Sequence, residues 1–286
     1  MTALRRVAPG KVNLCLYVGG RREDGLHELV SLVQAVDLAD ELVLEPAPPG
    51  SEGDETICPG VEGPNLAAAA LAAYRAASGW NGGAQRLTIT KRVPVAAGMG
   101  GGSSDAAATL CLAAKAAGRP DDPRLDELAP RLGADVTSLL RPGLVLMTGA
   151  GERVAPVPAR EPFTLLAIVL TDRLSSAEVY READRLGLPR SADELWAIHR
   201  EIEAALDRDG ELPMELLHND LELAARSLCP AVDGALGALR AAGAERTLVS
   251  GSGPTVFGVF RGSKPSVPVD ALEGYPGARL LRPLAA

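Results

Sequence analysis

The sequence predicts a fold that mixes α-helices with β-strands and is divided into two lobes. At 286 residues the chain exceeds a typical single domain of roughly 100–200 residues, so it can bury a sizeable core. Apolar or alternating runs typical of strands occur among Ala- and Leu-rich runs typical of helices. The proline-rich segment PVPAREP at 156–162 is typical of a linker, and it places the lobes at 1–157 and 158–286.

The first elements are two strands and a helix. We expect strands over 12–18 and 41–46, because neither apolar run contains a turn signal. The run LAAAALAAYRAA at 66–77 predicts a helix. Asn65 precedes it as the expected N-cap, and Gly79 follows it as the expected stop.

A strand and a second helix follow. RLTITKRV at 86–93 alternates as a strand does and stops at the next proline. After a glycine-rich loop, AAATLCLAAKAA at 106–117 predicts a helix for which Ser104 or Asp105 is the expected N-cap. The glycine and proline that come next are its stop signals.

The second lobe is expected to begin with a buried strand. Its apolar and helical runs predict a strand over 163–170, helices over 192–207, 213–228 and 231–242, and a strand, glycine turn and strand over 247–260. No period of 20–50 residues repeats, which excludes a solenoid.

Composition excludes several classes of protein. A net charge of −8 does not provide the basic field of a nucleic-acid or membrane-surface binder. Cys15, Cys58, Cys111 and Cys229 are scattered, so we expect reduced thiols and no zinc site or disulfide framework. The chain shows no signal-peptide pattern and no apolar run of about 20 residues, which predicts a cytoplasmic protein.

In the stretch PVAAGMGGGSSDAAATL at 94–110, a glycine-rich loop leads from the strand at 86–93 into the helix at 106–117. Its four glycines let an anion approach backbone N–H groups at a helix start, where the helix dipole favours negative charge. The loop therefore predicts a phosphate site. It lacks the G-K-[ST] of a Walker A loop, and Ser103 stands where the dinucleotide fingerprint has its last glycine. The alternative is a flexible connection with no ligand.

Three motifs in order resemble those of the GHMP small-molecule kinases. The loop is similar to the family signature P-x-x-x-G-[LM]-[GA]-x-[GS]-[SG]-[SA], and VSGSGPTVFG at 249–258 is similar to its C-terminal glycine motif. PGKVNLCLYVGGRREDGLHEL at 9–29 resembles the N-terminal motif of the members that phosphorylate 4-diphosphocytidyl-2-C-methyl-D-erythritol in non-mevalonate isoprenoid synthesis. The resemblance implies an α+β, two-lobed GHMP kinase fold that binds ATP, Mg²⁺ and a small-molecule substrate between the lobes.

The resemblance also implies roles for individual residues. Lys11 and Asp135 match the catalytic pair. The nucleotide site matches Asn65, beside the adenine, and Pro94, Val95, Ala96, Ala97, Gly98, Met99, Gly100, Gly101, Gly102, Ser103 and Ser104, of which Ser104 is also the expected metal ligand. The substrate site matches Asn13, Leu26, His27, Ser176, Tyr180, Gly251 and Gly253, with Tyr180 packing on the cytosine.

Phosphoryl transfer gives the pair a chemical rationale of its own. A carboxylate can take the hydroxyl proton, while a nearby ammonium keeps it ionised and orients the hydroxyl. The alternatives are that Asp135 is only the N-cap of a helix over VTSLL and that Lys11 is a solvated surface lysine. In the same way His27 could be a loop residue and the Gly251 turn a plain hairpin.

Lysine is scarce enough to be informative. Only four of the 29 basic residues are lysines, namely Lys11, Lys91, Lys115 and Lys264. A compact ammonium at a crowded reaction centre is not replaceable by a planar guanidinium, which favours a functional Lys11. Lys91, beside the loop, is interpreted as a solvated residue at a strand end, with phosphate binding as its alternative role.

Two departures from the family pattern concern the acceptor. Leu26 stands where the cytidyl kinases usually carry an aromatic residue, and Thr137-Ser138 replaces their Pro-[FV]. The function expected first is ATP-dependent phosphorylation of the 2-hydroxyl of the cytidyl compound. The alternatives are a GHMP kinase for another small alcohol, such as homoserine, a mevalonate derivative or a sugar, and a catalytically silent member that binds a ligand.

Overall fold

The structure is a computed structural model that describes residues 2–158, 160–207, 210–262, 272 and 274–285. Its backbone forms two compact units, each assembled from segments that alternate along the chain. The first unit takes Met1–Gly10, Leu38–Val95 and Gly100–Pro142, and the second takes Lys11–Asp37, Ala96–Met99 and Gly143–Ala286. The combination of sheets and helices confirms the predicted fold class. The lobe boundary expected at 157/158 stays a prediction.

The part of the sheet that lies in the first unit contains β1 (Leu4–Arg21) up to Gly10, the end of a second long strand and two shorter strands. The part of β2 (His27–Pro46) from Glu41 onward pairs antiparallel with β4 (Gln85–Thr90), and β3 (Glu55–Ile57) pairs parallel with β4. Leu42 lies opposite Ile89, and both are buried. This alternation of buried and less buried side chains gives the sheet one apolar face.

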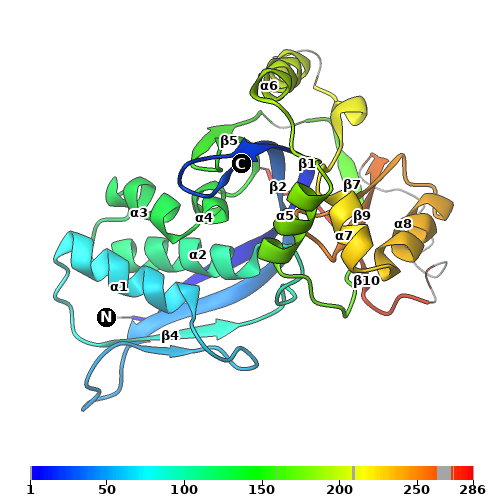
Figure 1. Cartoon of the computed structure of the whole chain (residues 1–286). Coiled ribbons are helices and arrows are strands. Elements are labelled where there is room, and N and C mark those ends of the chain that lie inside the picture. The colour runs from blue at the N-terminus through cyan, green and yellow to red at the C-terminus, as the bar shows by residue number, and fades with distance from the viewer. Residues whose placement is uncertain (1, 159, 208–209, 263–271, 273, 286) are drawn as a thin grey trace. The chain divides into compact units, whose positions relative to one another are not determined.

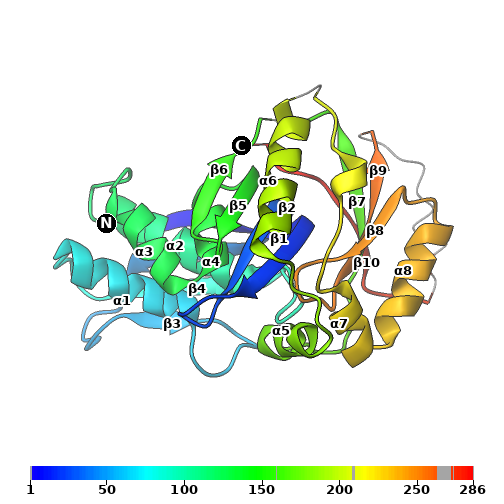
Figure 2. The ribbon, with the colours of Figure 1, turned by 45° about the horizontal axis from the view of Figure 1, so that its top comes forward.

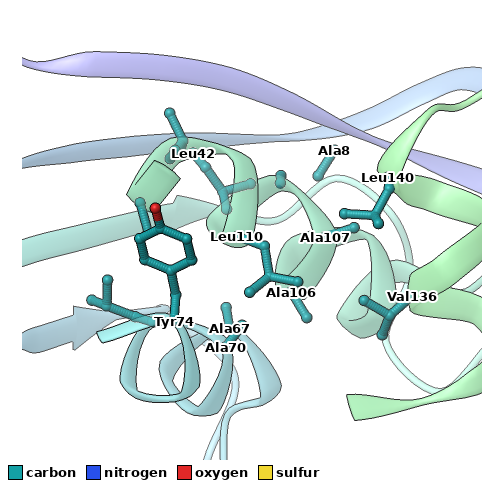
Figure 3. Close-up of a cluster of buried hydrophobic side chains, with 14 of the residues drawn as sticks. Ala8, Leu42, Ala67, Ala70, Tyr74, Ala106, Ala107, Leu110, Val136 and Leu140 are labelled. Atoms are coloured by element: carbon teal, nitrogen blue, oxygen red, sulfur yellow. The ribbon is translucent and has the colours of Figure 1, made fainter. Parts of the chain in front are cut away.

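Helices cover that apolar face. They are α1 (Leu66–Ser78), α2 (Gly101–Ala116), α3 (Arg124–Leu132) and α4 (Ala134–Leu140), and α1 lies beside α2 (Figure 1). Figure 3 shows their core, in which Tyr74 and the small side chains of α1 meet Ala106, Ala107 and Leu110 of α2. Because so many of these residues are alanines, the two helix backbones can approach closely, which places the first turn of α2 firmly.

The second unit contains an antiparallel sheet of four strands in the order β10-β7-β9-β8. These strands are β7 (Phe163–Ile168), β8 (Arg246–Val249), β9 (Val256–Arg261) and β10 (Ala278–Leu281). The unit also contains most of β1 (Leu4–Arg21), and β5 (Leu144–Gly149) pairs with β6 (Arg153–Pro156) and with the first part of β2.

The second unit also contains helices. They are α5 (Ser176–Arg185), α6 (Ala192–Asp207), the 3-10 helix η1 (Met214–Leu216), α7 (Glu222–Leu228) and α8 (Ala231–Ala241). Of these, α7 and α8 contact the four-stranded sheet, and α5 packs against α7. Figure 2 shows α7 and α8 beside β8, β9 and β10. Val179, Ala224 and Leu239 represent the apolar cluster that α5, α7 and α8 form with the sheet.

Most predicted elements are confirmed. The helix that Asn65 was expected to cap is α1, and the Asn65 side chain accepts hydrogen bonds from the N–H groups of Ala67 and Ala68. Gly79 follows the helix in the left-handed conformation. The strand at 163–170 and the helices at 192–207 and 231–242 correspond to β7, α6 and α8, and the turn in 247–260 connects β8 to β9.

Two predicted elements are wrong. The helix expected from 106 begins at Gly101, and its N-cap is Gly100 rather than Ser104 or Asp105. The helix expected over 213–228 is interrupted, because residues between η1 and α7 form an extended bridge to β1, in which Leu16 pairs with Asn219.

The four cysteines are free thiols, as expected. Across the described ranges, no helix combines the length and apolar character needed to span a bilayer.

Candidate active site

Lys11 lies in β1 with its side chain buried. Its exposed fraction is 4%, and its Nζ donates a hydrogen bond of 2.7 Å to Asn13 Oδ1. The two side chains meet because residues two apart on a strand point to the same face. The alternative interpretation of Lys11 as a solvated surface lysine is therefore wrong.

The orientation of Asn13 is fixed by a chain of hydrogen bonds. Asn13 Nδ2 donates to Ser31 Oγ at 2.9 Å, and Ser31 Oγ donates to the carbonyl of Cys15 at 2.6 Å. Since the NH₂ group of the Asn13 amide donates to Ser31, the carbonyl oxygen of the same amide faces the ammonium of Lys11. Burial raises the pKa of Cys15 to about 12, so its thiol is no nucleophile near neutral pH.

The glycine turn between β8 and β9 packs directly against this pair. A Cβ added to Gly251 would lie 3.1 Å from Asn13 Oδ1 and 3.5 Å from Lys11 Nζ. Gly251 also has φ of 58°, a conformation that side chains disfavour. The turn therefore brings its backbone, and no side chain, to the ammonium.

Residues 96–99 of the glycine-rich loop belong to the same cluster. The N–H of Lys11 donates to the carbonyl of Met99 at 2.9 Å, and Ser250 Oγ donates to the carbonyl of Gly98 at 3.1 Å. A Cβ on Gly98 would lie 2.5 Å from the Ser250 carbonyl oxygen. Within the second unit the structure thus brings together Lys11, part of the glycine-rich loop and the C-terminal glycine motif, although more than 200 positions separate Lys11 from that motif in the sequence.

A second cluster in this unit contains the expected acceptor residues. The rings of His27 and Tyr180 lie 5.2 Å apart between centroids, and His27 Nδ1 is 2.9 Å from the carbonyl oxygen of Gly19. His27 Nε2 lies 3.4 Å from a carboxylate oxygen of Asp184. Leu26 is 55% exposed.

Ser176, the first residue of α5, is connected to the glycine turn. Its Oγ lies 2.8 Å from Ser252 Oγ. Gly253, also expected in the substrate site, donates its N–H to the carbonyl of Ser250 and closes this turn.

The rest of the glycine-rich loop leads into α2 in the first unit. Gly101 packs tightly, since a Cβ there would lie 3.0 Å from Val93 Cγ1 and 3.2 Å from Lys91 Nζ, whereas a Cβ on Gly102 would meet nothing within 4 Å. The N-cap Gly100 supplies no side chain to the helix N-terminus. The first N–H groups of α2 are therefore the kind of donors that an anion can use.

Lys91 is not the solvated lysine that its place at a strand end suggests. Its Nζ donates to Asp40 Oδ2 at 2.5 Å and to Asp105 Oδ2 at 2.7 Å. Burial by itself would lower the pKa of Lys91, but the bonds to Asp105 and Asp40 raise it overall, so the side chain stays charged. Burial raises the pKa of Asp105. The hydrogen bond and the charge of Lys91 lower this pKa, but by less than burial raises it.

Two buried oxygen atoms in this part of α2 fit a hard cation. Ser104 Oγ and Asp105 Oδ1 are buried and, among the described residues, have no hydrogen-bond partner. Hydroxyl and carboxylate oxygens are the ligand types that Mg²⁺ takes, usually with phosphate oxygens and water completing the shell. No group of three or more His, Cys, Asp or Glu side chains that could hold a metal occurs in the described part of the chain. The residues present therefore fit a metal that is bound mainly through a nucleotide.

Asp135 lies in the first turn of α4. The N-cap of α4 is Gly133, so the alternative interpretation of Asp135 as an N-cap is wrong. The backbone carbonyl of Asp135 accepts a hydrogen bond of 2.9 Å from Ser138 Oγ. Ser138 belongs to the Thr137-Ser138 pair that departs from the family pattern, so this departure adds a hydrogen bond within the first turns of α4.

Sequence reasoning gave the residues that support these clusters no role in the site. Asp40 and Asp105 enclose Lys91, and Asn219 donates to the backbone of the glycine turn. The sequence places Asn219 in HNDLE at 218–222, a further stretch that resembles the family, but it does not reveal what this residue contacts.

Comparison with known proteins places the chain in a family. Residues 65–142 match the GHMP kinases N terminal domain, and residues 201–272 match the GHMP kinases C terminal domain. The 4-diphosphocytidyl-2-C-methyl-D-erythritol kinase of Methylobacterium radiotolerans is 40% identical over 274 residues, covering 93% of each chain. The enzyme of that name from Anaeromyxobacter dehalogenans is 39% identical over 90% of this chain and 80% of its own.

Solved structures agree with the sequence matches. A crystal structure of 4-(cytidine 5'-diphospho)-2C-methyl-D-erythritol kinase superposes with a TM-score of 0.77 at 37% identity, covering 99% of this chain and 100% of its own. A homoserine kinase from Cytophaga hutchinsonii, at 18% identity and a TM-score of 0.73, covers 99% of this chain and 95% of its own and shares the fold. The chain therefore belongs to the GHMP kinases, and within them to the family of the 4-diphosphocytidyl-2-C-methyl-D-erythritol kinases.

Proposed function

We propose that this kinase transfers the γ-phosphoryl group of ATP to the 2-hydroxyl of 4-diphosphocytidyl-2-C-methyl-D-erythritol. The observation that carries the proposal is the buried Lys11–Asn13 pair, against which the glycine turn packs without any side chain at Gly251. An ammonium beside two glycine-rich backbone segments is suited to phosphate groups. The cytidyl kinases to which the chain is similar support the choice of acceptor.

The reaction needs a group for the proton and groups for the charge. The acceptor hydroxyl oxygen forms a bond to the γ-phosphorus, the bond from that phosphorus to the β–γ bridging oxygen breaks, and ADP leaves. Asp135 takes the hydroxyl proton, and Lys11 provides positive charge for the transferred group. Asn13 fixes the direction of the ammonium through its 2.7 Å bond.

The nucleotide is assigned to the loop Pro94–Ser104 and to Asn65. N–H groups at the start of α2 and in the turns of the loop donate to the phosphate oxygens. Ser104 is assigned as a ligand of Mg²⁺ on the strength of its buried Oγ, with the carboxylate of Asp105 beside it. When bound, the ion neutralises negative charge on the β- and γ-phosphates.

The acceptor is assigned to His27, Tyr180, Leu26 and Ser176. The aromatic pair of His27 and Tyr180 offers ring faces and a polar edge to a pyrimidine base. Ser176 and the glycine turn, which meet through Ser252, are suited to the diphosphate of the same compound.

The test is an assay of ADP release with ATP, Mg²⁺ and a panel of alcohols that includes the cytidyl compound, homoserine, mevalonate and a hexose. We expect turnover with the cytidyl compound at a kcat/KM at least about 10²-fold above that of any other member of the panel. The matched control is Lys11→Met, which keeps an apolar stem of similar length and removes the ammonium. Faster use of another alcohol would replace the proposed acceptor, and no turnover with any of them would remove the proposed activity.

A further inference from the structure

The segment His218–Asp220 is held against β1 by its backbone. The N–H of Leu16 donates to the carbonyl of His218 at 2.7 Å, and the N–H of Asp220 donates to the carbonyl of Leu16 at 2.9 Å. Asp220 also binds Arg190 through two hydrogen bonds of 2.7 Å. The Asn219 residue between them is 3% exposed, so its side chain has a fixed environment.

The Asn219 amide is used on both sides. Its Nδ2 donates to the carbonyls of Val249 and Gly251, at 2.7 and 2.8 Å, and its Oδ1 accepts from the N–H of Leu221 at 2.9 Å. The two acceptors identify the nitrogen, and the donor identifies the oxygen. One side of the amide thus starts the turn before α7, and the other side holds the glycine turn.

The hydrogen bond to Gly251 sets the orientation of one peptide group. The turn is closed by the bond from the Gly253 N–H to the Ser250 carbonyl, and its first central residue, Gly251, has φ of 58°. Ser252 does not have a positive φ, a combination typical of a type II′ turn. Rotation of the Gly251–Ser252 peptide by about 180° would produce a type I′ turn and require positive φ at Ser252, which a serine disfavours.

That peptide carries an N–H group on the side opposite to Asn219. In a planar trans peptide the C=O and the following N–H point in opposite directions, so the Ser252 N–H points away from Asn219. Within the described part of the chain this N–H donates to no protein acceptor. The same turn lies against Lys11 Nζ and Asn13 Oδ1 at Gly251.

We propose that Asn219 is a positioning residue that aims the Ser252 N–H at a phosphate oxygen held next to Lys11. The inference rests on the proposed function and adds to it a backbone donor and the side chain that orients this donor. A preorganised N–H that meets a developing negative charge is worth about 10²–10³ in kcat when it is removed from an oxyanion site.

The first test replaces the donor side of the amide and keeps the acceptor side. Asn219→Asp retains an oxygen for the Leu221 N–H and removes both donors to the glycine turn. We expect kcat to fall at least about tenfold. Asp220→Asn is the matched control, because it weakens the neighbouring bonds to Arg190 and leaves the glycine turn untouched. At a temperature well below the melting points of the wild type and of the control, the control should keep kcat within about twofold, since in the described part of the chain no hydrogen bond of Asp220 reaches the glycine turn.

The second test removes the N–H itself. Ser252→Pro deletes the donor while a negative φ is retained, and Ser252→Ala, which keeps the N–H and loses only the hydroxyl, is the reference. We expect kcat of Ser252→Pro to be about 10²-fold below that of Ser252→Ala. Equal kcat values for these two variants, or a wild-type kcat for folded Asn219→Asp, would overturn the inference.

The wild type separates this inference from the proposed function. Turnover by the wild type tests the function, and the ratios among the variants test the positioning role. If the wild type does not use the cytidyl compound, ¹⁵N-serine-labelled protein provides the second measurement. The Ser252 amide peak, identified by its loss in Ser252→Pro, should then shift when inorganic pyrophosphate is added, and a peak that stays in place would contradict the inference.

Discussion

At the scale of single residues, the surroundings of Lys11 leave little room for a larger side chain. Its Nζ is bonded to Asn13, and the backbone of Gly251 lies directly beside it. The sequence predicted the importance of Lys11 from a motif and from the scarcity of lysine. It could not predict the partner, because the Asn13 amide obtains its direction from Ser31, which lies 18 positions away.

Lys11→Arg is expected to be impaired even though the positive charge is kept. A planar guanidinium is larger than an ammonium and cannot replace it between Asn13 and the glycine turn. We expect kcat to fall at least about tenfold, with melting temperature as the check on folding. Wild-type kcat in the arginine variant would show that the compact site imposes no such limit.

Asp135→Asn tests the assignment of the proton acceptor. If Asp135 takes the hydroxyl proton, kcat should fall by about 10²–10⁴ while ATP still binds. The assay is steady-state turnover together with calorimetric titration of ATP. Full turnover would leave Asp135 as a residue of the first turn of α4 without a part in the chemistry.

Leu26→Tyr tests the departure from the family pattern. Leu26 is 55% exposed, so a larger ring can be accommodated without disturbing a core. Stacking of a base on an aromatic side chain is worth about 1–3 kcal/mol, so KM for the cytidyl compound should fall several-fold. The reacting hydroxyl lies at the other end of the substrate, and kcat should hardly change. An unchanged KM would place the cytosine away from position 26.

At the scale of elements, helix α1 was predictable and the start of α2 was not. The Asn65 cap and the Gly79 stop are local signals that work without tertiary contacts. Gly101 and Gly102 have low helix propensity, and they are helical because the rest of α2 packs on α1 and Gly101 fits against Val93 and Lys91. Likewise, the bridge at Asn219 depends on a partner strand some 200 residues away, which no local pattern reveals.

Gly101→Val is the prediction that belongs to the element scale. The added Cβ would lie 3.0 Å from Val93 Cγ1 and 3.2 Å from Lys91 Nζ, and the γ-methyl groups of valine add to this crowding, so the first turn of α2 and these two side chains must move apart. We expect ATP binding, measured by calorimetry, to weaken at least about tenfold, because the proposed phosphate site uses the N–H groups of this turn. Gly237→Ala, a helical glycine with no atom within 4 Å of an added Cβ, is the control. Unchanged ATP affinity in Gly101→Val would remove the loop from the nucleotide site.

At the scale of the whole molecule, the two compact units alternate along the chain. Their boundaries fall inside β1, inside β2, within the glycine-rich loop and between α4 and β5, at Pro142 and Gly143. A proline-rich segment is a local signal and cannot report such an arrangement. The fold class and the family were predictable from three motifs, because glycine loops constrain the backbone so strongly that their sequence is distinctive.

Acid stability should depend on Asp220. Burial would raise the pKa of Asp220, but the bonds from His218 and Arg190 lower it below the unfolded value of about 3.9. A carboxyl with a depressed folded pKa stabilises the protein above the unfolded pKa, and this contribution is lost as the pH falls through the folded pKa. The melting temperature of the wild type should therefore exceed that of Asp220→Asn at pH 7, and the difference should shrink below about pH 3.9. A constant difference would show that the ionised carboxylate is not responsible.

The identity of the phosphorylated hydroxyl tests the central claim most directly. In 2-C-methyl-D-erythritol the second carbon carries a methyl group and no hydrogen, so a phosphate ester formed there has no proton three bonds from phosphorus. Proton-coupled ³¹P NMR of a reaction with ATP, Mg²⁺ and the cytidyl compound should therefore show a new phosphomonoester singlet, equal in amount to the ADP formed. A doublet or triplet would place the phosphate on another hydroxyl, and inorganic phosphate alone would show that this chain hydrolyses ATP and transfers nothing to the alcohol.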